Sequence, residues 1–108
     1  MNGECIVTKH TNSAFIGTDL EALLRRESIS TLVICGVITN NSVEATARMA
    51  GNLGYETYVV SDATAAFDKV DFAGKHHEAD EVQAMSLANL QGEYATIFST
   101  EEILSLLK

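Results

Sequence analysis

The chain has 108 residues, 46% of them hydrophobic, which is enough for one domain with a buried core and too few for two. Its 15 acidic residues outnumber its 7 lysines and arginines, and the formal net charge is −8. A surface this acidic repels phosphate backbones and anionic lipid headgroups, so we expect neither a nucleic-acid nor a membrane partner. Solubility is the simplest role for the charge.

Cys5 and Cys35 both fall in apolar runs that predict strands, so we expect two buried thiols. Their spacing fits neither a zinc site nor a disulfide framework. The N-terminal sequence lacks the apolar core of a signal peptide, and no apolar run is long enough to span a bilayer. These features predict a cytoplasmic protein without a metal site or a cofactor.

Strand-like and helix-like segments alternate along the chain. Residues 5–9 predict a short strand, and Thr18 with Glu21 has the capping-box spacing that begins a helix. Residues 31–37 form a continuous apolar run, as expected of a parallel strand covered on both faces. The inward face of the first predicted helix carries Leu20, Leu23 and Leu24.

The strand at 31–37 leads directly into a second predicted helix. Asn41 can cap this helix, with Glu44 three residues on, and Gly54 suits the left-handed position that follows its last turn. One stripe of the helix carries Val43, Thr46, Ala47, Ala50 and Leu53.

Residues 56–60 predict the next strand, followed by a polar loop over 61–71 in which Asp62 anchors a turn. A helix is predicted from about His76 to Leu90. Adjacent residues on a helix diverge by about 100°, so His76 and His77 are expected on the surface and not on one metal ion. The predicted inward residues of this helix are Ala79, Val82, Met85 and Leu90.

Residues 94–99 predict the last strand, and the capping-box spacing of Ser99 and Glu102 opens a short C-terminal helix. Repeated strand–helix units produce a parallel sheet with helices on its faces. The predicted fold is therefore α/β, in a single domain over residues 1–108.

Ligands in open parallel sheets bind beyond the carboxyl ends of the strands, here the loops at 9–17, 36–42 and 61–68. The second loop is the most informative, because its backbone donors around Ser42 lie at a helix N-terminus. Such donors attract an anion or a developing oxyanion, and they favour a charged nucleophile. The same residues also fit an ordinary strand–helix turn.

Three segments resemble the isochorismatase-like hydrolases, the relatives of nicotinamidase, N-carbamoylsarcosine amidase and isochorismatase. The segments read KxxxSAFxGTDLxxxLR from Lys9, TLVICGVxTNxxVxxTARxA from Thr31, and LGYxxxVVxDATAxFD from Leu53. The resemblance implies a three-layer αβα fold with a parallel sheet of strand order 3-2-1-4-5-6. The chain begins after the region of the family's first strands, so we expect an incomplete version of that fold.

The resemblance also implies a set of site residues. Amidases of the family use an Asp–Lys–Cys triad; Lys9 matches the lysine, and Ser42 stands where the nucleophilic cysteine is usual. A cis peptide bond is implied between Val37 and Ile38, with the amides of Ile38 and Ser42 forming an oxyanion hole. The implied pocket residues are His10, Phe15, Val37, Thr39 and Asn41.

Two departures from the family bear on the chemistry. The cysteine is replaced by Ser42, and the triad aspartate, like the metal-binding residues of nicotinamidases, belongs to the family's N-terminal region. A hydroxyl needs a general base in contact, whereas a helix N-terminus can ionise a thiol. Lys9 could act as that base only if neutral, and lowering its pKa that far costs about 4–5 kcal/mol.

Several interpretations of Ser42 stay open at this point. The serine is natural, since isochorismatases also lack the cysteine, or it is an engineered Cys→Ser change, or it marks a degenerate copy. It also fits a residue that merely helps to start a helix.

The sequence thus predicts an isochorismatase-family hydrolase scaffold acting on a small amide-type (C–N) or isochorismate-like substrate, impaired in the isolated chain. The alternative is a non-catalytic oligomeric binding or assembly protein that retains the scaffold. Because the family's first strand would lie beside residues 31–37, we expect an open sheet edge there. A homo-oligomer or a complementing N-terminal fragment would cover it.

Overall fold

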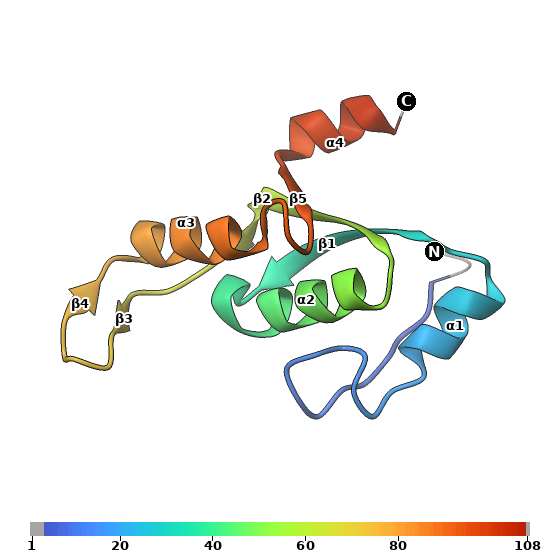
Figure 1. The fold of residues 1–108 in the computed structure, drawn as a ribbon, viewed down its shortest axis with the longest axis horizontal. Helices are drawn as coiled ribbons and strands as arrows, with labels where there is room; N and C mark the ends of the chain where they lie inside the picture. Colours follow the sequence, from blue (N-terminus) through green and yellow to red (C-terminus); the bar gives the residue numbers. More distant parts are fainter. Residues whose placement is uncertain (1–3, 108) are drawn as a thin grey trace.

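A computed structural model describes residues 4–107, in which three parallel strands form the central sheet (Figure 1). The strands are β1 (Thr31–Val37), β2 (Glu56–Ala65) and β5 (Thr96–Phe98), in the order β1-β2-β5. Strand β1 is therefore an edge strand. These strands coincide with three of the four predicted from the sequence, although β2 is longer than expected.

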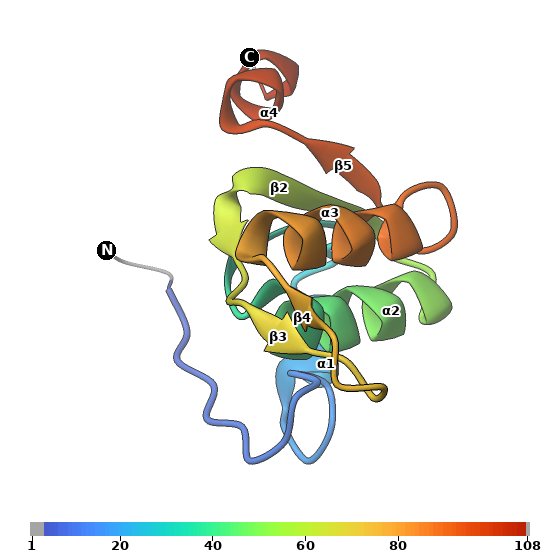
Figure 2. The same cartoon turned by 90° about the vertical axis from the view of Figure 1, so that its left-hand side faces the viewer.

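Helices cover both faces of this sheet (Figure 2). Helices α2 (Glu44–Asn52) and α3 (Ala79–Leu90) lie on one face, and α4 (Thr100–Leu106) lies on the other. The α/β class and the three-layer αβα arrangement predicted from the sequence are confirmed. Within residues 4–107, no helix combines the length and apolarity needed to cross a membrane.

The core lies between the sheet and the α2–α3 layer. The side chains of Val43, Ala47 and Ala50 are buried on the inward stripe of the second helical segment, as the sequence predicted. Gly54 follows α2 with φ +93°, the left-handed conformation expected after the last turn. The buried cluster comprises Val43, Ala47, Val59, Leu90 and Ala95.

The N-terminal predictions need correction. Residues 4–9 form no strand, because no neighbouring strand pairs with them, and Cys5 is exposed. Helix α1 (Leu20–Arg26) has Asp19 and not Thr18 at its N-cap, without a side-chain capping bond. Thr18 lies one residue earlier and accepts a hydrogen bond from the Leu20 amide at 3.3 Å.

Strand β1 is not covered on both faces, contrary to the prediction. Its residues alternate between exposed and half-buried, and Val33 and Val37 are 40% and 63% exposed. Cys35 lies on the uncovered side and is also exposed. A continuous apolar run therefore does not guarantee two covered faces at the edge of a sheet.

The predicted loop at 61–71 contains regular structure. Its first residues extend β2, and β3 (Lys69–Val70) pairs antiparallel with β4 (His76–His77). The hairpin projects from the body of the domain (Figure 1). Asp71 closes its loop by accepting hydrogen bonds from the amides of Ala73 and Lys75 at 2.9 Å each.

Helix α3 begins at Ala79 and not at His76, because the two histidines belong to the hairpin. The Ala79 amide donates to Asp68 at 2.8 Å, which satisfies one donor at the helix start. Leu90 is buried as predicted, but Met85 is 62% exposed. The buried position next to it is Ser86, a polar residue that the apolar pattern could not mark as inward.

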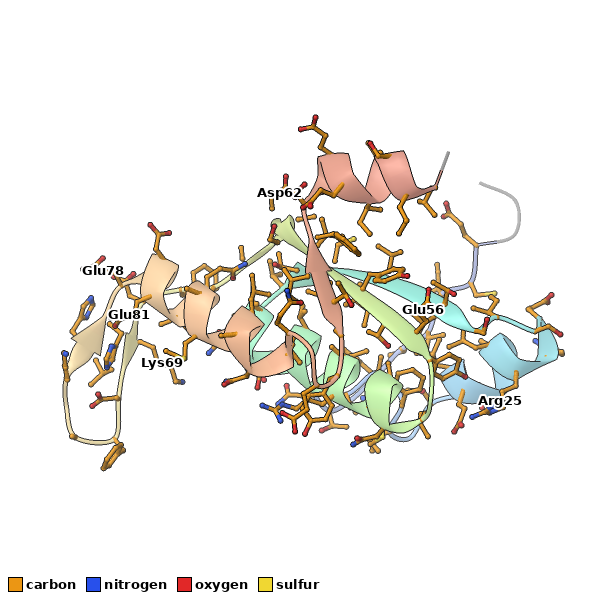
Figure 3. All side chains as sticks on the ribbon, turned by 45° about the horizontal axis from the view of Figure 1, so that its top comes forward. Arg25, Glu56, Asp62, Lys69, Glu78 and Glu81 are labelled. Atoms are coloured by element: carbon orange, nitrogen blue, oxygen red, sulfur yellow. The ribbon has the colours of Figure 1, made fainter. Side chains whose placement is uncertain are left out.

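Helix α4 begins with the predicted capping box, formed by Ser99 and Glu102. Asp62 lies in β2 and not in a turn, and its carboxylate accepts hydrogen bonds from the Thr100 amide and hydroxyl at 2.8 Å each. Figure 3 shows Asp62 beside the start of α4. These bonds from Thr100 lower the pKa of Asp62 and connect β2 to α4.

The Asp62 contact predicts a pH dependence of stability. Because the folded pKa is depressed, its contribution is present above the unfolded pKa and is lost as pH falls through the folded pKa. Asp62→Asn should therefore be less stable than the parent at neutral pH, and the difference should shrink as the pH falls below the unfolded carboxyl pKa of about 3.9. Thermal unfolding at several pH values measures this.

Asp19→Asn is the matched control, because the Asp19 side chain makes no capping bond. Its unfolding temperature should follow that of the parent at every pH. A difference between Asp62→Asn and the parent that does not depend on pH would contradict the role of the Asp62 charge.

Gly51 provides a second stability prediction. A Cβ at this position would lie 2.7 Å from the Tyr94 carbonyl oxygen, which is main chain and cannot swing aside. Glycine to alanine within a helix ordinarily stabilises, by about 0.5–1 kcal/mol. Gly51→Ala should instead destabilise, by about 1–3 kcal/mol in urea unfolding, because the overlap outweighs that gain. Asn52→Ala, at an exposed position of the same helix, should not destabilise.

Candidate functional site

The turn after β1 holds the predicted nucleophile position. The Val37–Ile38 peptide bond is cis, as the resemblance implied. The chain then enters a π-helical turn, η1 (Thr39–Val43), which continues directly into α2. Ser42 lies on this turn, and single π turns occur frequently at functional sites.

The start of this helical segment differs from the prediction in one respect. Asn41 does not cap the helix, because the N-cap position is taken by Ile38. The Ile38 carbonyl accepts hydrogen bonds from the amides of Asn41 at 3.1 Å and Val43 at 3.3 Å. The helical segment therefore begins closer to β1 than its sequence suggested.

The Ser42 hydroxyl is already hydrogen bonded. Its Oγ donates to the Val37 carbonyl oxygen at 3.1 Å, and no other partner occurs within residues 4–107. A peptide carbonyl orients a hydroxyl but does not accept its proton as a general base does. Ser42 is thus held in place by a group that leaves it un-ionised.

The N-terminal segment contacts the next turn of the same helix. The Ala14 amide donates to Thr46 Oγ1 at 3.0 Å, and Ser13 beside it is buried. Thr46 lies four residues after Ser42 and so on the same side of the helical segment. The structure therefore places the SAF motif one helical turn from Ser42.

Lys9 has no contact with Ser42 in the structure. It is exposed, and its ammonium donates to the Thr11 carbonyl oxygen at 3.1 Å. Lys9 and Ser42 remain a predicted pair of catalytic residues.

The other predicted pocket residues differ widely in exposure. His10, Val37 and Asn41 are exposed, whereas Thr39 is fully buried, with no hydrogen-bond partner at Oγ1. Phe15 is half-buried and stacks on Tyr55 with ring centroids 6.0 Å apart, a contact that fits a structural role.

A separate concavity of about 400 Å³ lies between the η1–α2 segment, the β3–β4 hairpin and α3. We call it the α3 groove. None of the predicted site residues lines it, and no sequence motif marks it, because its residues are far apart in the chain. Its lining residues are Asn40, Glu44, Lys69, His77, Glu81, Val82, Met85, Ser86 and Asn89.

Glu44 connects two helices at one wall of this groove. Its carboxylate forms an ion pair with Arg48 at 2.9 Å and accepts a hydrogen bond from the Ser86 hydroxyl at 2.6 Å. Arg48 also lies over the Tyr94 ring, 4.8 Å from its centroid. The charge of this half-buried carboxylate is therefore compensated by its neighbours.

His77 lies at the other end of the groove between two carboxylates. Its Nε2 lies 2.7 Å from the Asp71 carboxylate, and its Nδ1 contacts Glu81 on α3. Hydrogen bonds to Asp71 and then to Glu81 raise the pKa of His77, and the same bond to His77 lowers the pKa of Asp71. These pairs join the hairpin to the helix.

The hairpin also brings together one group of potential metal ligands. Asp68, His76 and Glu78 each offer one ligand atom, and these atoms lie within 4.8 Å of one another. His76 and His77 point to different carboxylates because adjacent strand residues face opposite sides of a hairpin. All three residues of the group are exposed.

The fold and the turn at Ser42 define an αβα hydrolase scaffold. The sequence comparisons show to which family this scaffold belongs. The Isochorismatase domain family matches residues 1–102, and the chain belongs to that family. The uncharacterised isochorismatase family protein YrdC of Bacillus subtilis is 46% identical over 105 residues, which are 97% of this chain and 56% of that protein. The chain thus spans little more than half the length of this relative.

Other similar proteins belong to the same family. A solved structure of an isochorismatase-family protein from Chromobacterium violaceum is 54% identical, with a TM-score of 0.95 over 99% of this chain and 55% of that one. Nicotinamidase 3 of Arabidopsis thaliana is 38% identical over 64 residues, which are 59% of this chain and 32% of that one. The predicted family and fold are confirmed.

The Ser86–Glu44 contact is predicted to stabilise the packing of α3 on α2. Ser86→Ala removes a donor from a half-buried carboxylate and should cost about 1–3 kcal/mol in urea unfolding. Ser105→Ala is the control, because Ser105 is exposed on α4. Equal stability of the two variants would contradict the importance of the bond.

Proposed function

We propose that the chain forms part of the active site of an isochorismatase-family hydrolase that acts on a small amide-type or isochorismate-like substrate. The observation that carries the proposal is the position of Ser42, on a π turn just after the cis Val37–Ile38 bond at the carboxyl end of β1. In this proposal the amides of Ile38 and Ser42 bind the developing oxyanion. The match to a nicotinamidase supports an amide-type substrate.

Lys9 and the pocket residues His10, Phe15, Val37, Thr39 and Asn41 are proposed to surround the substrate. The contact of the SAF segment with Thr46 supports this arrangement, because it holds the chain after Lys9 on the Ser42 side of α2. Lys9 would reach the substrate by leaving the Thr11 carbonyl, which is an exposed and therefore weak contact.

We further propose that the chain alone is impaired as a catalyst. Within residues 4–107, no carboxylate contacts the Ser42 hydroxyl, and its only partner is a peptide carbonyl. The Lys9 ammonium donates to the Thr11 carbonyl oxygen and makes no hydrogen bond to Ser42. A serine nucleophile needs a base in contact, and the described residues do not supply one.

The edge of β1 is the proposed place where the site is completed. Val33, Cys35 and Val37 are exposed along this strand, and an uncovered apolar edge favours pairing with another strand. A second copy of the chain or a complementing N-terminal fragment could supply that strand together with a carboxylate. Assembly and catalysis would then depend on the same surface.

The alternative is a non-catalytic binding or assembly protein that keeps the scaffold. The bond from Ser42 to the Val37 carbonyl favours it, since that bond satisfies the hydroxyl without any reacting partner. Under this alternative the β1 edge still assembles, but no acyl-enzyme forms at Ser42.

The proposal predicts the behaviour of Ser42→Cys. A thiol at a helix start ionises far more readily than a hydroxyl. Even so, the variant should not hydrolyse nicotinamide or other primary amides in dilute solution, because no base completes the site. Activity is measured by ammonia release, and adducts at position 42 by mass spectrometry.

Concentration separates the two candidate functions. If self-assembly completes the site, the specific activity of Ser42→Cys should rise with protein concentration, in parallel with the assembly seen by sedimentation. Assembly without activity or adduct at any concentration supports the binding protein. Enzyme-like turnover by a dilute monomer would contradict the proposed impairment. Ser105→Cys, at an exposed position of α4 on the other face of the sheet, controls for a non-specifically reactive thiol.

A further inference from the structure

The α3 groove lies on the side of the helical segment away from Ser42. Asn40 and Glu44 line the groove, and each is two residues from Ser42. Residues two apart on a helical turn point to roughly opposite sides, so Ser42 faces away from the groove. The groove is thus a second site, and its occupancy does not depend on the proposed hydrolase activity.

The size and walls of the groove suit a small molecule. Its volume of about 400 Å³ lies within the range of ordinary ligand pockets, roughly 300–1,000 Å³. Val82 and Met85 supply apolar surface from consecutive turns of α3, beside the polar and charged residues of the lining. Met85 is 62% exposed, which leaves its thioether free to pack on a flat apolar ligand.

The charged groups of the groove differ in whether they are paired. Glu44 is paired with Arg48 and Ser86, and Glu81 with His77. The Lys69 ammonium has no hydrogen bond or ion pair within residues 4–107. In Figure 3 the Lys69 side chain extends from the hairpin toward the body of the domain, on the same side as Glu81. Lys69 is therefore the cation available to a ligand.

We propose that the α3 groove binds a small aromatic carboxylate, with its ring against Val82 and Met85 and its carboxylate paired with Lys69. Charge complementarity selects the anion, since the carboxylates of the groove already have partners and the lysine does not. The flat apolar wall selects the ring. The overall charge of −8 opposes anions at long range, so affinity depends on this local pair.

Benzoate and its neutral isostere benzamide test the proposal on the full 108-residue chain. In NMR titrations of ¹⁵N-labelled protein, benzoate should bind saturably with a dissociation constant on the order of 1 mM. It should shift the amides of Val82, Ser86 and Asn89.

Lys69→Met is the decisive variant, because it keeps the aliphatic stem and removes the charge. It should weaken benzoate binding about tenfold and leave benzamide binding unchanged. Lys75→Met, in the loop of the same hairpin and outside the groove, should bind both probes like the parent. Met85→Ala should weaken both probes alike.

Three results would overturn the proposal. They are benzoate binding that survives Lys69→Met, amide shifts confined to residues outside the groove, and the absence of saturable binding. Lys69 is exposed on the hairpin, so its replacement should not unfold the chain, and the unperturbed spectrum of Lys69→Met verifies this.

Discussion

The close packing of α2 on the sheet determines where Ser42 and the other residues of the η1 turn lie. Ala47 and Ala50 have no exposed surface, and Gly51 lies against the Tyr94 main chain, so the helix approaches the strands as closely as small side chains allow. The π turn that joins β1 to α2 is held at the carboxyl end of the sheet by this packing. Ser42 then faces one side of the turn, and Asn40 and Glu44 face the other, where Ser86 fixes Glu44 against α3.

The sequence predicted the elements whose evidence is local. The apolar stripe from Val43 to Ala50, Gly54 after α2, and the capping box at Ser99 all describe short-range geometry, and all are present. The predictions that were wrong concern residues whose structure depends on a neighbouring segment. Residues 5–9 have the composition of a strand, but no strand lies beside them. Cys35 was predicted to be buried, but within the described residues nothing covers its side of β1, and it is exposed. The histidines at the hairpin read as helical because their pairing with Lys69 and Val70 depends on a turn built by Asp71.

The candidate site divides in the same way. The residues pointed only to a strand–helix turn with donors near Ser42; the cis bond at Val37–Ile38 and the role of Lys9 came from the family resemblance. The structure bears out the cis bond, whereas the role of Lys9 stays a prediction. The α3 groove could not be predicted from the sequence. Its residues Asn40, Lys69 and Val82 are distant in the chain and come together only through the packing of the hairpin and α3, for which there is no sequence motif.

The open edge of β1 and the un-ionised Ser42 are two aspects of one constraint. One edge of β1 pairs with β2 and the other edge is unpaired within the described residues, and α2 packs over one face of the sheet. A carboxylate that approaches Ser42 along the sheet must therefore come from the unpaired side of β1, where Val33 and Val37 are exposed. Pairing a strand there would bury apolar surface, satisfy edge hydrogen bonds and bring a base to the hydroxyl in one step. Under the proposed function, the chemistry at Ser42 is therefore conditional on what occupies the edge.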